Sequence, residues 1–546
     1  TLPNGERLKL TPNIKLLFEV ESLKYATLAT VSRCGMIWFS EEVLSDNHIF
    51  SYFLLRLKQD NFDSKLKNSA ESGGDRSVFK LREKCVSFIE FMFISVDGVS
   101  FVSQALNIIR KYDHVMEFSR IRVIESLMTL VRKRVDSVVE MEEIKFGNYS
   151  KNEDVMRKYM INWVLRNINW AFAGDLKLEE RYKYYDELKN SFFENKDQLN
   201  FPNLKPNSSI IDYDVSIEDG EFVAWKTKVP VLDINIDKVT NADTIIPTVD
   251  TIRHREFLCS WLKERRPFII CGPPGSGKTM TLMSTLKHLQ DFEMIFVNFS
   301  SSTNPKLIMK QFDHYCEYVK GPKGVVLRPK SPNKWLVVFC DEINLPDEDK
   351  YGTQIVITFL RQLTEQNGFW RVSDKQWITL ERVQFVGACN PPTDSGRHPL
   401  GNRFLRHCPL ILVDFPSYDS LIQIYGTFNR ALFKKIPNLR AYADSLTNAM
   451  VEFYSESQKR FTSDQHPHYI YSPRELTRWK YAINEGIDFI NSLEDLVRLW
   501  AHEAQRLFED RLVEKEEREW CQLKIDEIAY KHFSGLNQSS LKRPII

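Results

Sequence analysis

Apolar residues along this chain follow two patterns, one typical of buried strands and the other typical of amphipathic helices. Short apolar runs at 268–271, 335–340 and 385–389 predict strands of a buried parallel sheet. Apolar positions at helical spacing dominate residues 81–200. They return after residue 417 in four predicted helices, at 421–433, 442–458, 473–491 and 493–514. The pattern therefore predicts sheet regions and helical regions in alternation.

A weak internal repeat organises these regions. In the second half of the chain, a polar hairpin at 369–380 precedes a strand at 383–388, a short helix that carries Arg403 and Arg406, and a last strand at 410–413. The chain is expected to contain this module whole.

The first forty residues show a similar order of elements. A hairpin turn at Asn4 and Gly5 precedes a predicted strand at 14–20, then Arg33, then a strand at 36–39. We therefore expect the chain to open at the tail of a preceding module whose own phosphate loop is missing. The chain begins with Thr1 rather than Met, so it is expected to be a piece of something longer.

Changes in residue composition along the chain indicate where one predicted domain ends and the next begins. Residues 58–80 are polar and contain glycine, which predicts a linker or exposed loop, and Pro202 and Pro206 interrupt the helical pattern before a β-like segment at 222–232. Four parts follow: the end of a first sheet domain (1–40), a helical domain with its linker (41–205), a second sheet domain (206–416), and a second helical domain with a trailing segment (417–546).

The candidate chemistry begins with a glycine-rich loop between the strand at 268–271 and a predicted helix at 280–289. Residues 272–279 match G-x-x-x-x-G-K-[ST], the loop that wraps nucleotide phosphates. Lys278 is expected to reach the outer phosphates, and the Thr279 hydroxyl to bind Mg²⁺. The predicted nucleotide-binding residues here are Pro274, Gly275, Ser276, Gly277, Lys278, Thr279 and Met280.

Polar residues at later strand ends complete the predicted site, because ligands gather at the carboxyl ends of parallel strands. Asp341 is expected to hold the Mg²⁺ shell, and Glu342 to polarise the attacking water. Asn390 is expected to bind the γ-phosphate or that water. Asn298, at the end of an earlier strand, is a candidate partner that would hold Glu342 inactive. An ordinary loop or helix cap is the competing explanation for each of these polar residues.

Residues from the helical parts are also candidates. Ser472 and Pro473 are predicted to start a helix, which would let Arg474 reach back to the phosphates. Arg406, with Arg403 as the alternative, and Arg33 at the same point of the repeat are candidates for arginines that act on a neighbouring site. Pro247 and Thr248, ahead of the module, are proposed as the wall against adenine.

Composition also argues against some classes of partner and environment. The net charge is +1, with 27% charged residues and no basic block, which argues against nucleic acid as a main partner. The best membrane candidate, 86–102, is broken by Glu90 and Asp97, so no membrane span is expected. The nine cysteines include no C-x-x-C pair, which favours a cytosolic protein without disulfides.

Taken in this order along the chain, the motifs resemble those of an AAA+ ATPase. Longer stretches of sequence narrow this resemblance to one family. The stretches FCDEINLPD (339–347), KYGTQ (350–354), FVGACNPPTD (385–394) and HYIYSPRE (468–475) resemble the third AAA+ module of the cytoplasmic dynein heavy chain family. YATLATVSRCG (25–35) resembles the end of the second module, and LKRPII (541–546) the lead-in to the fourth.

The resemblance implies an α/β P-loop fold with a parallel-sheet large subdomain and a helical small subdomain, in tandem with a truncated preceding module. On this basis 1–40 and 41–205 belong to the second module, and 206–416 and 417–546 to the third. It further implies ATP or ADP with Mg²⁺, and a regulatory ATPase in a cytoplasmic, minus-end-directed microtubule motor with a coiled coil elsewhere in the chain.

The resemblance also assigns partners. Each site would be completed by an arginine from the next module, so Arg406 would serve the second module's site and Arg33 the first, while the site of Lys278 would need the fourth module. Glu19 stands about where Asn390 stands later, which suggests a second site that binds nucleotide without hydrolysis. Adjacent modules, the microtubule and a WD40-propeller regulator are implied partners. The alternatives are a nucleotide-binding module that never hydrolyses and a midasin-type ring ATPase.

Overall fold

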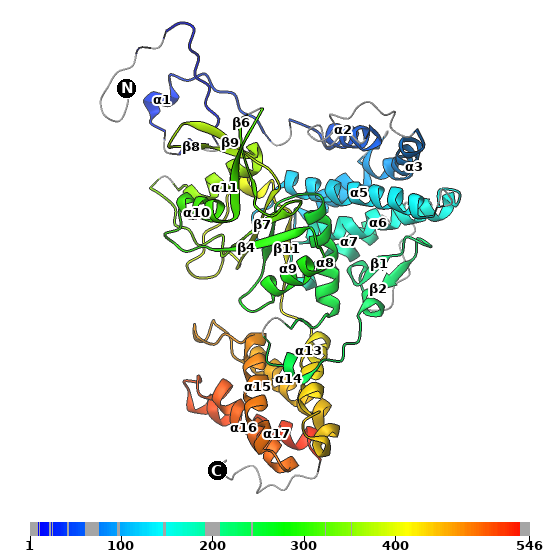
Figure 1. The fold of residues 1–546 in the computed structure, drawn as a ribbon, viewed down its shortest axis with the longest axis vertical. Helices are drawn as coiled ribbons and strands as arrows, with labels where there is room; N and C mark the ends of the chain where they lie inside the picture. The colour runs from blue at the N-terminus through cyan, green and yellow to red at the C-terminus, as the bar shows by residue number, and fades with distance from the viewer. Residues whose placement is uncertain are drawn as a thin grey trace.

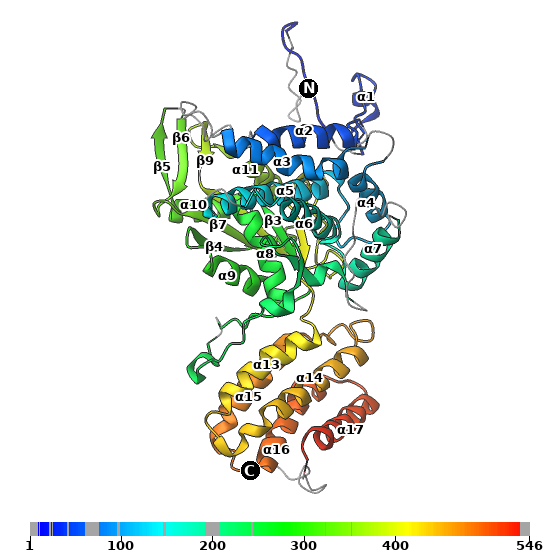
Figure 2. The same cartoon turned by 90° about the vertical axis from the view of Figure 1, so that its right-hand side faces the viewer.

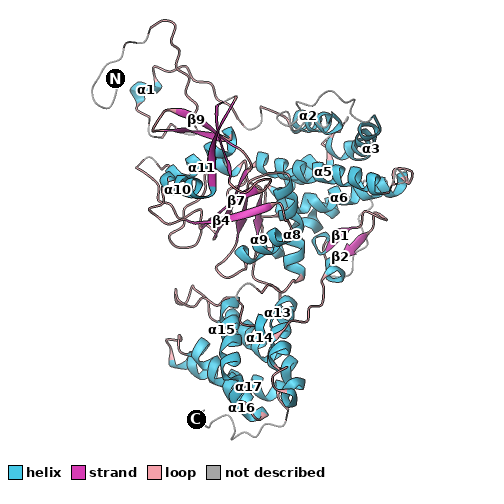
Figure 3. Cartoon of the chain, in the orientation of Figure 1, coloured by secondary structure: helices cyan, strands magenta, loops and turns pink. Residues whose placement is uncertain are grey.

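The computed structural model of the protein describes residues 9, 11–20, 23–24, 26–40, 43–59, 76–95, 99–145, 149–191, 208–241, 244–322, 324–350 and 352–534. Figure 1 shows a larger upper body, which combines a sheet region with a block of helices, and a smaller helical body below it. Figure 3 shows that the lower body consists of helices and loops, whereas the strands lie in the upper body.

A five-stranded parallel sheet forms the centre of the upper body, as the apolar runs predicted. Its strand order is β11-β3-β10-β7-β4. The strands are β3 (Phe268–Cys271), β4 (Phe292–Asn298), β7 (Trp335–Asp341), β10 (Val383–Cys389) and β11 (Leu410–Leu412). Cys271 lies opposite Cys389, and Asn298 lies opposite Asp341, so the strands end together along one edge. The buried apolar side chains of these strands explain why they pair in the interior.

Successive side chains of each strand enter two different hydrophobic cores, because side chains alternate between the faces of a sheet. Phe268 and Ile270 belong to the core that contains α8 and α9, while Ile269 and Cys271 belong to the core that contains α10 and α11. The helices are α8 (Val249–Lys263), α9 (Lys278–Lys287), α10 (Pro305–Tyr315), α11 (Ile355–Gln366) and the short α12 (Asn402–Leu405). The sheet is therefore covered on both faces.

A block of helices from the first half of the chain shares the core of the first face. Its members are α2 (Asp46–Gln59), α3 (Arg76–Phe93), α4 (Phe101–Ile109), α5 (Arg120–Ile144), α6 (Glu153–Ala173) and α7 (Leu178–Ser191). The prediction of mostly helical structure over 81–200 is confirmed for its described part. In the predicted linker, 58–80, the described residues 58–59 and 76–80 belong to α2 and α3 instead, while 60–75 and 192–207 lie outside the described residues. The short hairpin β1 (Tyr213–Val215) and β2 (Phe222–Ala224) follows, and Trp225–Lys228 forms a 3₁₀ turn within the segment predicted as β-like.

Arg181 on α7 joins this block to the sheet. Its buried guanidinium donates hydrogen bonds to the carbonyl oxygens of Leu176 at 3.0 Å, Gly174 at 2.7 Å and Leu412 on β11 at 2.9 Å. Burial, together with repulsion from Arg253, lowers the pKa of Arg181 to about 9. The helical block and the sheet consequently form one body.

A second sheet stands beside the first, with the order β5-β6-β9-β8. It comprises β5 (Cys316–Gly321), β6 (Gly324–Pro329), β8 (Gly368–Arg371) and β9 (Gln376–Leu380). The antiparallel pairing of β8 with β9 confirms the hairpin predicted at 369–380.

The lower body, which we call the lid, has its own core. Its helices are α13 (Tyr418–Leu432), α14 (Ala443–Arg460), α15 (Pro473–Gly486), α16 (Leu493–Ala504) and α17 (Lys515–His532), with a π-helical turn at Gln505–Glu509. All four predicted lid helices are present, although the last ends earlier than the pattern suggested, and 535–546 lies outside the described residues.

A segment from before α8 also belongs to the lid. This strap (residues 229–247, of which 242–243 lie outside the described residues) buries Ile234, Val239 and Ile246 in the lid core. The buried ammonium of Lys480 on α15 donates to the Val239 carbonyl at 2.7 Å. Figure 2 shows the strap leaving the upper body, running alongside the lid and returning to α8. Two separate stretches of chain, the strap and residues 413–417, therefore connect the two bodies.

The strands predicted at 14–20 and 36–39 are wrong for this structure. Neither segment pairs with a described strand, and apolar side chains such as Leu17 and Trp38 are largely exposed. The physical reason is that neither lies beside a strand of the described sheets, and an isolated apolar run has no backbone partner. A short helix, α1 (Leu28–Val31), lies between them. The turn predicted at Asn4 and Gly5 lies outside the described residues.

We expect Arg181→Met to destabilise the upper body, because it removes the buried donor that binds three carbonyl groups. A loss of about 2–4 kcal/mol is expected for buried acceptors that lose their partner, which corresponds to a fall of roughly 3–5 °C in the thermal midpoint of a body of this size. Differential scanning calorimetry of the chain measures this. Arg328→Met is the control, since Arg328 makes an exposed ion pair with Glu317. An equal, small shift in both variants would contradict the expected role.

Candidate functional site

The glycine-rich loop connects β3 to α9 and has the backbone that its glycines require. Gly275 and Gly277 have φ angles of 85° and 91°, in the left-handed region that other residues avoid. A Cβ on Gly272 would lie 2.1 Å from the carbonyl oxygen of Val413, so this position admits no side chain. The buried Ser276 hydroxyl has no hydrogen-bond partner among the described residues. An unpaired buried hydroxyl inside a loop of this shape fits a ligand that supplies acceptor oxygens.

Lys278, the first residue of α9, is a buried cation surrounded by neutral oxygens. Only 8% of the residue is exposed. Its Nζ donates to the carbonyl oxygens of Gly272 at 2.6 Å and Pro273 at 3.2 Å, and to Oδ1 of Asn390 at 2.9 Å. Burial lowers the pKa of Lys278. A buried ammonium without a carboxylate in direct contact is stabilised by an incoming anion.

Asn390, which follows the neighbouring strand β10, therefore contacts the glycine-rich loop region through Lys278. Its side chain is almost fully buried, and its backbone oxygen accepts a hydrogen bond from Asn344 at 2.9 Å. Asn344, which is fully buried, was not among the predicted residues, although it stands only two positions after Glu342. It connects the loop after β7 to the end of β10.

Asp341 ends β7 and Glu342 follows it directly, as the sequence predicted. Glu342 has a φ of 58°, which is strained for a residue with a side chain. Its amide donates to Oδ1 of Asp341 at 3.0 Å. The Glu342 carboxylate forms an ion pair with Arg397, and among the described contacts none joins it to Asn298, the candidate partner. Nothing in the sequence distinguishes Arg397 from the neighbouring loop residues, so the pairing appears only in the fold.

The start of α15 rests on the glycine-rich loop from the lid side. Ser472 is the N-cap and Pro473 the first helical residue, as predicted, and Glu475 completes the capping box. A Cβ on Gly275 would lie 2.9 Å from the Ser472 hydroxyl and 3.5 Å from Cγ of Arg474. Arg474 is exposed and adjacent to the loop, a position from which its guanidinium can approach bound phosphates.

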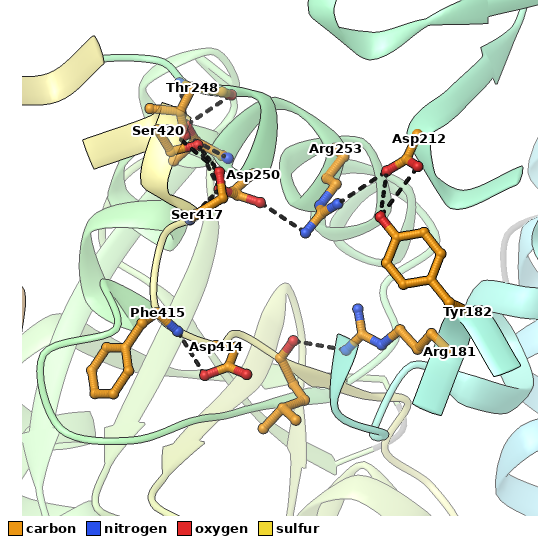
Figure 4. A network of polar contacts seen from close by, with 12 residues as sticks. Arg181, Tyr182, Asp212, Thr248, Asp250, Arg253, Asp414, Phe415, Ser417 and Ser420 are labelled. Carbon is orange, nitrogen blue, oxygen red and sulfur yellow. Dashed lines mark hydrogen bonds and ion pairs between the residues drawn. The ribbon is translucent and has the colours of Figure 1, made fainter. Parts of the chain in front are cut away.

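Pro247 and Thr248 lie where the strap, α8 and the lid meet. Thr248 is the buried N-cap of α8, and the Pro247 carbonyl accepts from Gln423 of α13 at 2.9 Å. Nearby, the Asp250 carboxylate accepts from the Ser420 hydroxyl at 2.7 Å and pairs with Arg253 at 2.7 Å. Figure 4 shows this polar network reaching Asp212 and Tyr182 through Arg253, and Ser417 through Asp250, while Asp414 and Phe415 form a separate contact nearby.

The two residues predicted to bind Mg²⁺, Thr279 and Asp341, lie at the same edge of the sheet, at the start of α9, which follows β3, and at the end of β7, with β10 between the two strands. Within the described ranges, no three His, Cys, Asp or Glu side chains gather as a metal site. A hydroxyl and one carboxylate fit Mg²⁺ in its usual form, in which substrate phosphates and water supply the other ligands.

The arginines predicted to act on neighbouring sites lie away from this edge. Arg406 binds Glu365 at 2.7 Å, and Arg403 binds Glu19 at 2.9 Å. Arg33 is exposed and donates to the Ala29 carbonyl at 3.2 Å. The roles predicted for these arginines therefore stay predictions.

All nine cysteines are free thiols, and no helix among the described residues is long and apolar enough to cross a membrane.

Three family models match consecutive parts of the chain. Residues 94–227 match the dynein heavy chain AAA lid domain, 234–416 match the P-loop containing dynein motor region, and 428–518 match the dynein heavy chain ATPase lid domain. The order of these matches follows the helical block, the sheet region and the lid.

Curated relatives match the whole chain. It is 57% identical over 551 residues to a cytoplasmic dynein heavy chain of Paramecium tetraurelia, 48% identical over 585 residues to one of Dictyostelium discoideum, and 49% identical over 556 residues to one of Drosophila melanogaster. Each match covers 100% of this chain, and the chain spans 12% of the length of each of these relatives.

We expect Gly275→Ala to push the lid away from the loop, because the added Cβ would meet Ser472. Gly277→Ala is the matched control: its φ is equally unfavourable, but the space around it is open. Hydrogen exchange of the first turn of α15 should rise in Gly275→Ala and stay unchanged in Gly277→Ala. Equal exchange in the two variants would show that the lid does not rest on Gly275.

Proposed function

Because the chain belongs to the dynein heavy chain family, we propose that its glycine-rich loop binds ATP and that the module hydrolyses it as a regulatory ATPase of a motor ring. The observation that carries this proposal is the surroundings of Lys278. A buried ammonium held by neutral oxygens, beside Asn390 and one strand from Asp341 and Glu342, is suited to receive a polyphosphate.

The chain's own residues supply the binding and positioning. Lys278 would exchange its carbonyl partners for phosphate oxygens, and the loop amides and the start of α9 would bind the remaining negative charge. Glu342 would orient and polarise the attacking water, with Asn390 beside it. Mg²⁺, held through Thr279 and Asp341, would neutralise charge on the phosphate oxygens. Pro247 and Thr248 would border the adenine.

Hydrolysis would be completed by an arginine from the module that follows, while Arg406 would serve the preceding site and Arg33 the one before it. This assignment is supported by the contacts of Arg406, which pairs with Glu365 on α11 and not with a residue of the glycine-rich loop. Arg474 would bind the γ-phosphate from the lid side, so loss of that phosphate would release the lid from the loop. A contact made in only one nucleotide state is what biases a two-state element.

In the whole protein, the module would gate the main ATPase of the ring and its release from microtubules. Its partners would be the adjacent modules and, through a distant part of the chain, the microtubule, with a WD40-propeller regulator near the third and fourth modules. The cytoplasmic relatives support a cytoplasmic, microtubule-associated location.

A module that binds nucleotide without hydrolysing it is the second candidate, favoured by the ion pair that engages Glu342. The dynein family matches favour this family over the midasin type.

Lys278→Ala should weaken ATP and ADP binding by roughly 10- to 100-fold, the effect of losing a hydrogen bond to a charged group. Titration with a fluorescent nucleotide analogue measures the affinity. Lys287→Ala, an exposed lysine at the other end of the same helix, should bind like the wild type. Unchanged affinity in Lys278→Ala would refute the site assignment.

Glu342→Gln should retain ATP but slow its hydrolysis by about 10²–10⁴-fold, since the amide keeps the shape of the side chain without its basic oxygen. In the full-length motor, this variant should also slow movement severely if the module gates the ring. Single-molecule velocity, with ATP shown to persist at this site, measures the effect. Movement of the motor at wild-type speed under those conditions would contradict a gating role and would show that the module acts only as a scaffold.

A further inference from the structure

A second cation at this site, Arg397, has no role in the proposed chemistry. It lies in the loop between β10 and α12 (residues 390–401), and its Nη1 forms an ion pair with Oε2 of Glu342. The side chains are 13% and 32% exposed, respectively. The two atoms are in contact but lack the alignment of a hydrogen bond. The contact between the two side chains is therefore one of opposite charges.

The backbone around both partners keeps them in place. The Arg397 amide donates to the Asp394 carbonyl at 3.2 Å, and the next amide, of His398, donates to the Asn344 carbonyl at 3.0 Å. On the other side, Glu342 has its left-handed φ, and its amide binds the Asp341 carboxylate. The loop that carries Arg397 is thus joined to the loop that carries Glu342.

These contacts engage Asp341, Glu342 and Lys278 inside the protein. Asp341 accepts from the Glu342 amide, Glu342 pairs with Arg397, and Lys278 binds Asn390. The carboxylate of Asp341, which would hold Mg²⁺, also accepts the amide of Glu342, whose backbone is strained.

We propose that Arg397 is a positioning residue that holds Glu342 in a resting orientation and thereby restrains ATP hydrolysis; this rests on the function proposed above. The guanidinium binds the carboxylate oxygen that a polarised water needs as its acceptor. Hydrolysis then requires Glu342 to leave Arg397. Direct action of Arg397 on the phosphates is the competing role, and it predicts a rate change of the opposite sign.

The test is single-turnover hydrolysis of radiolabelled ATP by the chain extended through the module that follows, which supplies the arginine that completes the site. Arg397→Ala should raise the rate by roughly 3- to 10-fold, the size of coupling expected for groups in contact, while ATP affinity changes little. Arg397→Lys, which keeps the charge but not the fork of donors, should fall between the wild type and Arg397→Ala. Arg328→Ala, which breaks an exposed ion pair on β6, should change nothing.

The double variant identifies the route. If Arg397 acts through Glu342, Arg397→Ala should have no effect in a Glu342→Gln background, whereas a merely structural role would change both backgrounds alike. A lower or unchanged rate in Arg397→Ala with ATP bound would overturn the proposal.

Hydrogen exchange of the loop at 391–401 tests the contact independently of turnover. Glu342→Gln and Arg397→Ala should each raise exchange there without nucleotide, and unchanged exchange would overturn the restraint. Failure of the proposed function is distinct, because it would appear as absent ATP binding in the wild type, or as equal rates in the wild type and Glu342→Gln.

Discussion

Parallel pairing of five strands in a common register is the constraint on which the site depends. Because the strands run the same way, their carboxyl ends meet along one edge, and the chain leaves each end with a different chemical group. The glycine-rich loop leaves β3, two carboxylates leave β7, and Asn390 leaves β10. The buried contact between Lys278 and Asn390 spans residues 112 positions apart in the sequence. Few side chains are needed to assemble the site, since the sheet has already brought the ends together.

Local patterns predicted the parts of this arrangement that local residues determine. The strand, loop and helix around Lys278 follow from one apolar run, three glycines and one helical face. The start of α15 follows from Ser472, Pro473 and Glu475, which satisfy the first backbone amides of a helix by themselves. Apolar character alone was insufficient at 14–20 and 36–39, because a strand also needs a neighbour, and none of the described strands lies beside them.

The contacts between distant loops could not be predicted in the same way. Arg397 is one of several arginines near Asn390, and its selection as the partner of Glu342 depends on how two loops fold over the sheet edge. The strap is similar: its three buried apolar residues are spaced irregularly and suggest no helix or strand. They are buried because they enter the core of a body formed about 200 residues later in the chain.

The strap has a mechanical consequence. A lid joined through residues 413–417 alone could swivel and twist in many directions, whereas a body attached at two points rotates freely only about the line between them. Lys480 and the three apolar residues fix one attachment to the lid, and the chain from β11 to α13 provides the other. Any rotation of the lid about this axis also turns the strap. The strap enters α8 at Thr248 at its far end, and its near end follows the helical turn at Trp225–Lys228. A movement of the lid would therefore also be felt where the strap joins the helical block and α8.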